Sequence, residues 1–316
     1  MIQDLAPEFC MTTTFDLIAP PLAPLHANGS LNLGGVEKMA EHFIDNGIAG
    51  VFVSGTSGES QSLTVQERLA LAQRWLDVSR STDLHVIIQV GHNCIEDARI
   101  MARHAQSEGA DAVATLAPSF LKPETVEDLI DCCRPVAQAA GDLPFYLYDI
   151  PSVTDVSLPM PEFLIKGKEQ LPNLRGLKFT NTDMMQLQEC LHLNDGEFDI
   201  LFGCDQMLLA GVMFGCPGAV GTTYNFAAGH YRRMIDAFHA GDLTTARRLQ
   251  HEAVCMIRVF QKYGFLSATK VVMRSLGIDC GPVRAPLRPL TADQEPQLLD
   301  ELSSEPALAN AELATA

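Results

Sequence analysis

The chain of 316 residues is poor in basic side chains, and this shortage limits the partners it can bind. It carries 22 lysines and arginines against 39 aspartates and glutamates, which gives a formal net charge of −17. Nucleic-acid binding depends on clustered basic side chains that contact phosphates. The sequence therefore argues against a nucleic-acid partner, and the acidic balance mainly favours solubility.

Long hydrophobic runs are also missing. No apolar stretch approaches the roughly 20 residues that a membrane helix needs. The first residues, "MIQDLAPEFCMTTTFD", have neither the basic start nor the hydrophobic segment of a signal peptide. We therefore expect a cytoplasmic protein with no membrane partner.

The nine cysteines lack the spacing of a metal site. They are scattered without a C-x-x-C pair or a paired histidine spacing, so we expect reduced thiols in the core and no structural zinc. The histidines at positions 85, 92 and 104 are interpreted as surface or supporting groups and not as ligands. The prediction is a protein without a metal.

What the sequence does contain is a repeated alternation of strand and helix. Eight short runs rich in Val, Ile and Phe are each followed by a segment with 3.6-residue periodicity. Because most runs are apolar on both sides, they favour a closed parallel (β/α)₈ TIM barrel, an α/β fold, over an open sheet. The runs are "FDLIAPPLAPL", "GVFVSGTSGE", "HVIIQVGHN", "DAVATLAPSF", "PFYLYDIP", "LRGLKFTN", "DILFGCDQ" and "GAVGTTYN".

The barrel is expected to occupy residues 1–227. Residues 228–276 read as further helices, broken at Gly241-Asp242 and at Gly264, which exceed what barrel closure requires. We interpret residues 228–316 as a C-terminal helical extension packed on the barrel, with surface for subunit contacts. The tail from Thr291 is expected to fray.

Working residues of barrel enzymes lie at the C-terminal ends of the strands and in the loops that follow them. In this chain the rule selects residues 55–59, Tyr148, residues 178–180, residues 203–206 and residues 221–225.

Lys178 is the most informative of these residues, because it is one of only seven lysines and stands between Leu177 and Phe179 in an apolar strand. Burial disfavours the ammonium form and lowers the pKa of a lysine. The neutral amine can then attack a carbonyl and form a Schiff base that accepts electrons from a breaking carbon–carbon bond. The alternative is a lysine that extends to water or pairs with Asp205 or Asp183.

Tyr148, at the end of the preceding strand, can reach the same pocket. A phenol there can serve as general acid and base if it lies within hydrogen-bond distance of the reacting group. The alternative is an ordinary aromatic side chain that caps the barrel.

The stretch "GTSGES" after the second strand predicts a site for an anion. Its backbone N–H groups and the hydroxyls of Thr56 and Ser57 suit a substrate carboxylate, although a plain strand-to-helix turn remains the alternative. Glu59 stands where a serine-hydrolase elbow needs glycine, and no G-K-[ST] of a P-loop follows. Glu59 is expected to brace the loop by accepting hydrogen bonds.

Three motifs in their order along the chain support a family resemblance. The stretches "GTSGE", "YDIP" and "GLKFTNTD" resemble the carboxylate loop, the strand-five motif and the Schiff-base strand of the pyruvate-dependent class I aldolases. These enzymes form the dihydrodipicolinate synthase and N-acetylneuraminate lyase superfamily. The resemblance extends from about residue 15 to 290.

Within the superfamily, the chain is more similar to the N-acetylneuraminate lyases. The stretches "LFGCDQMLLAGVMFGCPGAVGTTYNF" and "APSFLKP" resemble lyase segments. The synthases carry an arginine five residues after the strand-five tyrosine, where this chain has Val153. An isopropyl group cannot replace an arginine fork on a carboxylate, so the synthase activity is disfavoured.

The resemblance implies a role for each site residue. It implies Lys178 as Schiff-base lysine, Tyr148 as proton shuttle, Thr56 and Ser57 on the pyruvate carboxylate, and the Val220 backbone lining that end of the site. The residues implied to face the sugar-derived part of the substrate are Thr180, Gly203, Asp205, Gln206 and Thr222. No cofactor beyond the covalent Schiff base and no metal is implied, and family members are commonly homotetramers.

The chain departs from the lyase pattern at three places. Gln206 stands where glutamate is usual, which leaves the sugar substrate open. Thr222 replaces a serine and keeps its hydroxyl. Ser119 and Phe120 occupy the segment where bacterial members often carry a relay tyrosine.

The predicted reaction is reversible aldol cleavage of N-acetylneuraminate, or a close sialic acid, to pyruvate and an N-acylmannosamine. Gln206 keeps open another aldolase or a dehydratase acting on a 2-keto-3-deoxy sugar acid. A barrel that only senses a keto acid is disfavoured, because a binder has no need of a covalent lysine.

Overall fold

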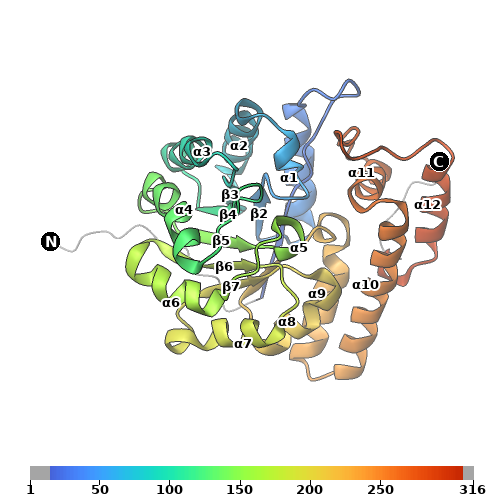
Figure 1. The fold of residues 1–316 in the computed structure, drawn as a ribbon. Helices are drawn as coiled ribbons and strands as arrows, with labels where there is room; N and C mark the ends of the chain where they lie inside the picture. Colours follow the sequence, from blue (N-terminus) through green and yellow to red (C-terminus); the bar gives the residue numbers. More distant parts are fainter. Residues whose placement is uncertain (1–14, 309–316) are drawn as a thin grey trace.

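Eight parallel strands form a closed barrel in the computed structural model, which describes residues 15–308 (Figure 1). Each strand pairs with its neighbour in sequence, and β8 pairs with β1 to close the ring. The predicted TIM barrel is therefore confirmed. In chain order the strands are β1 (Asp16–Ala19), β2 (Gly50–Val53), β3 (His85–Gln89), β4 (Ala112–Leu116), β5 (Phe145–Asp149), β6 (Leu174–Phe179), β7 (Asp199–Phe202) and β8 (Gly218–Val220).

The strands are short and buried on both faces, which explains their continuous apolar sequences. All residues of β2 and all residues of β5 are buried. Side chains that alternate inward along the strands fill the barrel, and those that point outward pack against the helices. The inner cluster contains Ile18, Phe52, Ile87, Ala112, Ala114, Tyr146, Tyr148, Ile150, Leu201 and Val220.

Helices surround the barrel, and local capping groups fix where several of them begin. Reciprocal capping boxes start α2 at Thr64 and α4 at Thr125, while the Asp183 carboxylate accepts two backbone N–H groups at the start of α7. The helices up to the last strand are α1 (Val36–Asp45), α2 (Val65–Ser79), α3 (Ile95–Glu108), α4 (Val126–Ala139), α5 (Pro151–Thr154), α6 (Met160–Gln170), α7 (Met184–His192) and α8 (Leu208–Phe214).

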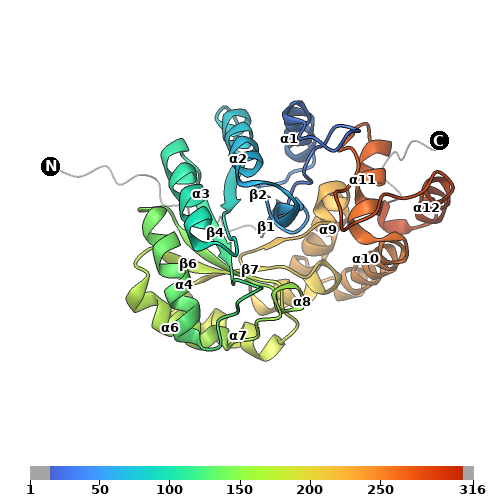
Figure 2. The ribbon, with the colours of Figure 1, turned by 45° about the horizontal axis from the view of Figure 1, so that its top comes forward.

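Four α-helices follow β8, and three of them, α10 to α12, lie together on one side of the barrel (Figure 2). Helix α9 (Tyr224–His239) packs against β1 and completes the ring, so the boundary expected at residue 227 falls inside this helix. The extension consists of α10 (Leu243–Tyr263), α11 (Phe265–Ser275) and α12 (Gln294–Ser303). The breaks predicted at Gly241-Asp242 and Gly264 separate α9, α10 and α11.

The segment from residue 291 to Leu308 was expected to fray, but in the structure it contains a packed helix. Helix α12 packs through Leu298 and Leu302, both with no exposed area, and a 3₁₀ turn at Pro306–Leu308 follows it. These buried leucines stabilise a helix that the polar sequence around them does not suggest. The last residues, 309–316, lie outside the described part of the chain.

Two further expectations concern cysteines and membranes. All eight cysteines of the described residues are free thiols, and Cys10 lies outside those residues.

Between residues 15 and 308, no helix is both long and apolar enough to cross a membrane.

Candidate active site in the barrel

Lys178 lies inside the barrel between two aromatic rings. It stands opposite Tyr148 in the register of β5 and β6, and only 4% of its surface is exposed. Its Nζ is 3.9 Å from the centroid of the Tyr148 ring and 4.0 Å from the centroid of the Phe52 ring. The amine is therefore shielded from solvent, and the faces of two aromatic rings pack against it.

Burial lowers the pKa of Lys178 from 10.5 to about 7, while the nearby negative charge of Asp205 opposes this shift. The alternatives from the sequence do not describe this lysine. It does not extend to water, the Asp183 carboxylate caps α7, and the Asp205 carboxylate accepts hydrogen bonds from Thr223. A substantial fraction of the amine is thus uncharged near neutral pH.

The lowered pKa predicts how adduct formation with a keto acid depends on pH. We expect the initial rate to rise between pH 6 and 8 and to level off above the lysine pKa of about 7, because only the free amine attacks a carbonyl. Rates of borohydride-trapped adduct with pyruvate, measured from pH 5.5 to 9, check this. A midpoint near 10 would contradict the burial of the amine.

Tyr148 presents its hydroxyl to the loop that follows β2. Tyr148 Oη lies 3.3 Å from Thr56 Oγ1, and its ring packs edge-on against Phe52. Burial raises the pKa of Tyr148 to about 12, although interactions with the Thr56 and Thr180 hydroxyls lower it. Tyr148 is therefore a neutral phenol before reaction, with a proton to give beside the lysine.

The loop after β2 meets the loop after β8 through a pair of hydroxyls. Ser57 Oγ lies 2.6 Å from Thr222 Oγ1, and Ser57 is buried whereas Thr56 is exposed. Val220, at the end of β8, belongs to the same inner cluster as Tyr148. The structure thus gathers Thr56, Ser57 and Thr222 on the side of Tyr148 where β2, β5 and β8 end.

Thr180 and Gly203 form a close contact across the ends of β6 and β7. Thr180 Oγ1 is buried near the Tyr148 hydroxyl, but within residues 15–308 no group meets it with hydrogen-bond geometry. A Cβ at position 203 would lie 1.9 Å from this oxygen, so only glycine fits there. The unpartnered hydroxyl is available to a ligand, and Gly203 provides the space that Thr180 occupies.

Asp205 and Gln206 are neighbours in sequence but differ completely in environment. Asp205 Oδ2 accepts from Thr223 N at 2.9 Å and from Thr223 Oγ1 at 2.6 Å, and burial raises the pKa of the carboxyl. Thr223 Oγ1 also lies 2.8 Å from Tyr231 Oη. Asp205 is thus engaged beneath the loop after β8, while Gln206 is exposed at the rim.

Glu59 braces the loop, as the sequence predicted. Its Oε2 accepts the Arg284 backbone N–H at 2.7 Å, and its Oε1 lies 2.8 Å from Lys270 Nζ. Both side chains of the ion pair are almost fully buried, at 4% exposure for Lys270 and 1% for Glu59. The partners of the carboxylate are therefore Lys270 of α11 and the backbone of Arg284, both in the C-terminal part of the chain.

One group of side chains within residues 15–308 has the composition of a metal site. Ligand atoms of His92, Cys94 and Asp97 lie within 4.8 Å of one another after β3. The Cys94 N–H is 3.0 Å from His92 Nδ1 and occupies its lone pair, and Asp97 lies in the first turn of α3, where the helix dipole favours anions. We assign no metal to these residues.

Two side chains that shape the site were not singled out from the sequence, and a third, Thr223, lay in the selected segment 221–225 without an assigned role. Phe52 stacks on the lysine, Thr223 binds Asp205, and Lys270 pairs with Glu59. The strand alternation in "GVFV" already places Phe52 inside the barrel, and that signal was available. The roles of Thr223 and Lys270 are recognisable only once the tertiary packing is known.

The comparison with protein families agrees with this geometry. The model of the dihydrodipicolinate synthetase family matches residues 14–305, nearly the whole chain. The chain belongs to this family. Members of the family named N-acetylneuraminate lyase are among the similar proteins. The lyase A of Xenopus laevis is 38% identical over 278 residues, which are 86% of this chain and 90% of that protein.

Solved structures of family members share the fold closely. The N-acetylneuraminate lyase of Proteus mirabilis has a TM-score of 0.91 at 38% identity and covers 94% of this chain and 100% of its own. The enzyme of Aliivibrio salmonicida has a TM-score of 0.91 at 36% identity, covering 94% and 99%. These findings confirm the resemblance predicted from the sequence, and with it the class I aldolases and carbon–carbon lyases as the enzyme class.

Proposed function

We propose that the chain catalyses reversible aldol cleavage of N-acetylneuraminate to pyruvate and N-acetylmannosamine through a Schiff base on Lys178. The observation that carries the proposal is the dry amine of Lys178, whose pKa burial lowers to about 7, facing the neutral phenol of Tyr148. The names of the similar enzymes from Xenopus laevis and Proteus mirabilis support the choice of substrate.

Lys178 begins the reaction by attacking the C2 ketone of the open-chain sugar acid. Tyr148 gives its proton to the departing C2 hydroxyl, which leaves as water, and the resulting phenolate lies beside the iminium cation. The phenolate then takes the C4 hydroxyl proton as the C3–C4 bond breaks. The electrons of that bond move into the iminium to form an enamine, and the aldehyde is released.

The second half of the reaction returns both residues to their starting state. Tyr148 supplies the proton to C3 of the enamine. Water then attacks the resulting iminium, the proton released in this hydrolysis returns to the Tyr148 phenolate, and pyruvate leaves as Lys178 becomes a free amine again. Because the protonated Schiff base is itself the electron sink, the proposed reaction requires neither metal nor further cofactor.

The proposed binding residues surround the amine on two sides. Thr56 and Ser57, together with the Val220 backbone, hold the pyruvate carboxylate where β2 and β8 end. Along the sugar, the unpartnered Thr180 hydroxyl, the Gly203 backbone, Gln206 and Thr222 provide hydrogen bonds. Asp205, whose Oδ2 is bound to Thr223, orders the loop that carries Thr222 and leaves at most Oδ1 for the substrate.

Gln206 is proposed to contact the far end of the sugar. We expect Gln206→Ala to raise the KM for N-acetylneuraminate about two- to tenfold, the worth of one ordinary hydrogen bond. The concentration of pyruvate that half-saturates adduct formation should not change, because pyruvate lacks the sugar tail. Steady-state kinetics and adduct titration of one preparation check both. A change in pyruvate saturation would place Gln206 elsewhere in the site.

The second candidate is an aldolase or dehydratase for another 2-keto-3-deoxy sugar acid. The exposed, neutral Gln206 favours it, because the usual glutamate of the lyases is missing. Pyruvate release from N-acetylneuraminate and from a panel of keto sugar acids distinguishes the two. The highest kcat/KM with N-acetylneuraminate supports the lyase, and a higher value with an unrelated keto sugar acid contradicts it.

For the whole molecule, we propose a cytoplasmic homotetramer with a small-molecule substrate and without nucleic-acid or membrane partners. Phe120 and Leu121 after β4 are 84% and 83% exposed, and Val153 in α5 is 57% exposed, which supports a subunit contact on this side. We also retain the proposed division into a barrel and a helical extension, with α9 assigned to the barrel. Sedimentation equilibrium reports the number of subunits.

A further inference from the structure

The segment that carries Thr56 and Ser57 has an unusual backbone on both sides. Ser54, before the two hydroxyl residues, has φ of 57°, and Glu59, after them, has φ of 50°. Residues other than glycine rarely adopt this left-handed region. Such conformations persist only where surrounding contacts hold them, and they concentrate at binding sites.

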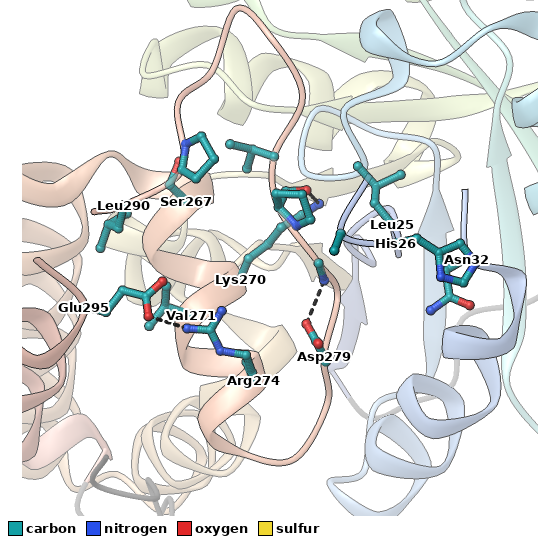
Figure 3. A pocket seen from close by; sticks show the side chains of 15 residues that line it. Leu25, His26, Asn32, Ser267, Lys270, Val271, Arg274, Asp279, Leu290 and Glu295 are labelled. Atoms are coloured by element: carbon teal, nitrogen blue, oxygen red, sulfur yellow. Dashed lines mark hydrogen bonds and ion pairs between the residues drawn. The ribbon is translucent and has the colours of Figure 1, made fainter. Parts of the chain in front are cut away.

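Besides hydrogen bonds within the loop, a buried contact from the C-terminal extension holds this segment. Lys270 of α11 extends towards the segment that follows Asp279 (Figure 3). Its Nζ donates to Ala23 O at 3.0 Å and to Pro282 O at 2.7 Å, and it lies 2.8 Å from Glu59 Oε1. The ammonium thus makes two hydrogen bonds to backbone carbonyls and an ion pair with the carboxylate of the strained segment.

The other carboxylate oxygen of Glu59 is held by the same part of the chain. Arg284 N–H donates to Glu59 Oε2, and the Arg284 guanidinium binds both carboxylate oxygens of Glu67 in α2. The stem of Lys270 lines a cavity of about 400 Å³ between α11 and the segment around Leu25. Removing the ammonium therefore takes away the positive charge paired with Glu59 and leaves the hydrogen bond from Arg284 N–H, without creating a clash.

We propose that Lys270 is a positioning residue for the carboxylate-binding loop: its buried charge holds Glu59, and through Glu59 it holds Thr56 and Ser57 where the pyruvate carboxylate binds. This inference rests on the proposed function. A buried carboxylate that loses its partner is strongly disfavoured, and the backbone can relieve it by turning Glu59 towards water. That rotation would move the adjacent hydroxyls away from Tyr148.

The test compares Lys270→Met and Glu59→Gln with the unchanged protein. We expect Lys270→Met to raise the half-saturating pyruvate concentration for adduct trapping at least about tenfold, since the loop loses its charged brace. The kcat should change much less than pyruvate saturation, because the carboxylate contacts of the loop are made equally to substrate and transition state. Glu59→Gln keeps the acceptor for Arg284 N–H and should give a smaller shift in the same direction.

The matched control removes a lysine from a surface ion pair of the same extension. Lys262 pairs with Glu301 between α10 and α12, with 61% of its side chain exposed. Lys262→Met should leave pyruvate saturation within about twofold, as expected for exposed pairs. In the folded Lys270→Met protein, hydrogen exchange of residues 54–63 should be faster than in this control.

The outcomes separate this inference from the proposed function. If the unchanged protein forms no adduct on Lys178, the proposed function fails and this inference fails with it. The unchanged protein can form the adduct while Lys270→Met and Glu59→Gln leave both the half-saturating pyruvate concentration and the hydrogen-exchange rate of residues 54–63 unchanged. That result would contradict only the positioning role. Should Lys270→Met fail to fold, the near-isosteric Glu59→Gln decides alone.

Discussion

Replacing Lys178 with methionine is expected to abolish adduct formation and to lower turnover by at least about 10⁴-fold. The thioether has a similar volume but no nucleophile, so the covalent route and its electron sink are both lost. Turnover is measured with the best substrate of the sugar-acid panel, and the adduct by borohydride trapping with pyruvate. Residual turnover within 100-fold of the unchanged protein would contradict a Schiff base at this residue.

The same variant should be more stable than the unchanged protein at neutral and acidic pH. The pKa of Lys178 falls from 10.5 to about 7 on folding, a difference that corresponds to about 5 kcal/mol. Below pH 7 the folded protein carries the full cost of the buried charge. As pH rises from about 7 to 10.5 the unfolded chain binds more protons than the folded one, so this cost disappears.

Urea unfolding of both proteins across this pH range measures the effect. The stability advantage of Lys178→Met should be largest below pH 7 and should shrink towards pH 10.5. Because both proteins share all other titrating groups, their difference isolates the lysine. A difference that does not change with pH would show that Lys178 has an ordinary pKa in the folded protein.

Replacing Tyr148 with phenylalanine is expected to separate adduct formation from turnover. The ring that contacts Lys178 Nζ remains, so the amine stays buried and should still form a trapped adduct with pyruvate, more slowly because water must protonate the departing hydroxyl. Turnover should fall by about 10² to 10⁴, the usual contribution of one acid–base group. Full turnover in this variant would remove Tyr148 from the mechanism.

Tyr146 provides the matched control for this substitution. It lies two residues earlier in β5, belongs to the same inner cluster, and donates to Asp199 Oδ2 at 3.1 Å at the start of β7. Tyr146→Phe should cost about 1 kcal/mol of stability through the lost hydrogen bond. It should keep turnover within a few-fold, because its hydroxyl lies at the opposite end of the strands.

The parts of the site that follow from strand order could be predicted from the sequence. Parallel buried strands appear as uninterrupted apolar runs, so the eight runs located the barrel and its C-terminal rim. Lys178 and Tyr148 occupy the same level in adjacent strands, and this register places the amine on the ring. The brace at Glu59 followed from its position at the end of a tight loop.

The remaining features depend on contacts between distant parts of the chain. The environment of Asp205 is set by Thr223, and Glu59 pairs with Lys270, which belongs to a different structural unit. Thr223 lies in the selected segment 221–225, but no local pattern pairs it with Asp205, and none marks Lys270. Helix α12 was missed for the same reason, since it is stabilised by packing and not by its own sequence.

The most direct test of the account is to trap the unchanged protein with borohydride in the presence of pyruvate and to map the modified peptide by mass spectrometry. We expect one pyruvate-derived adduct per chain, on Lys178, formed faster as pH rises through about 7. An adduct on any of the other six lysines, or none under saturating pyruvate, would contradict the account.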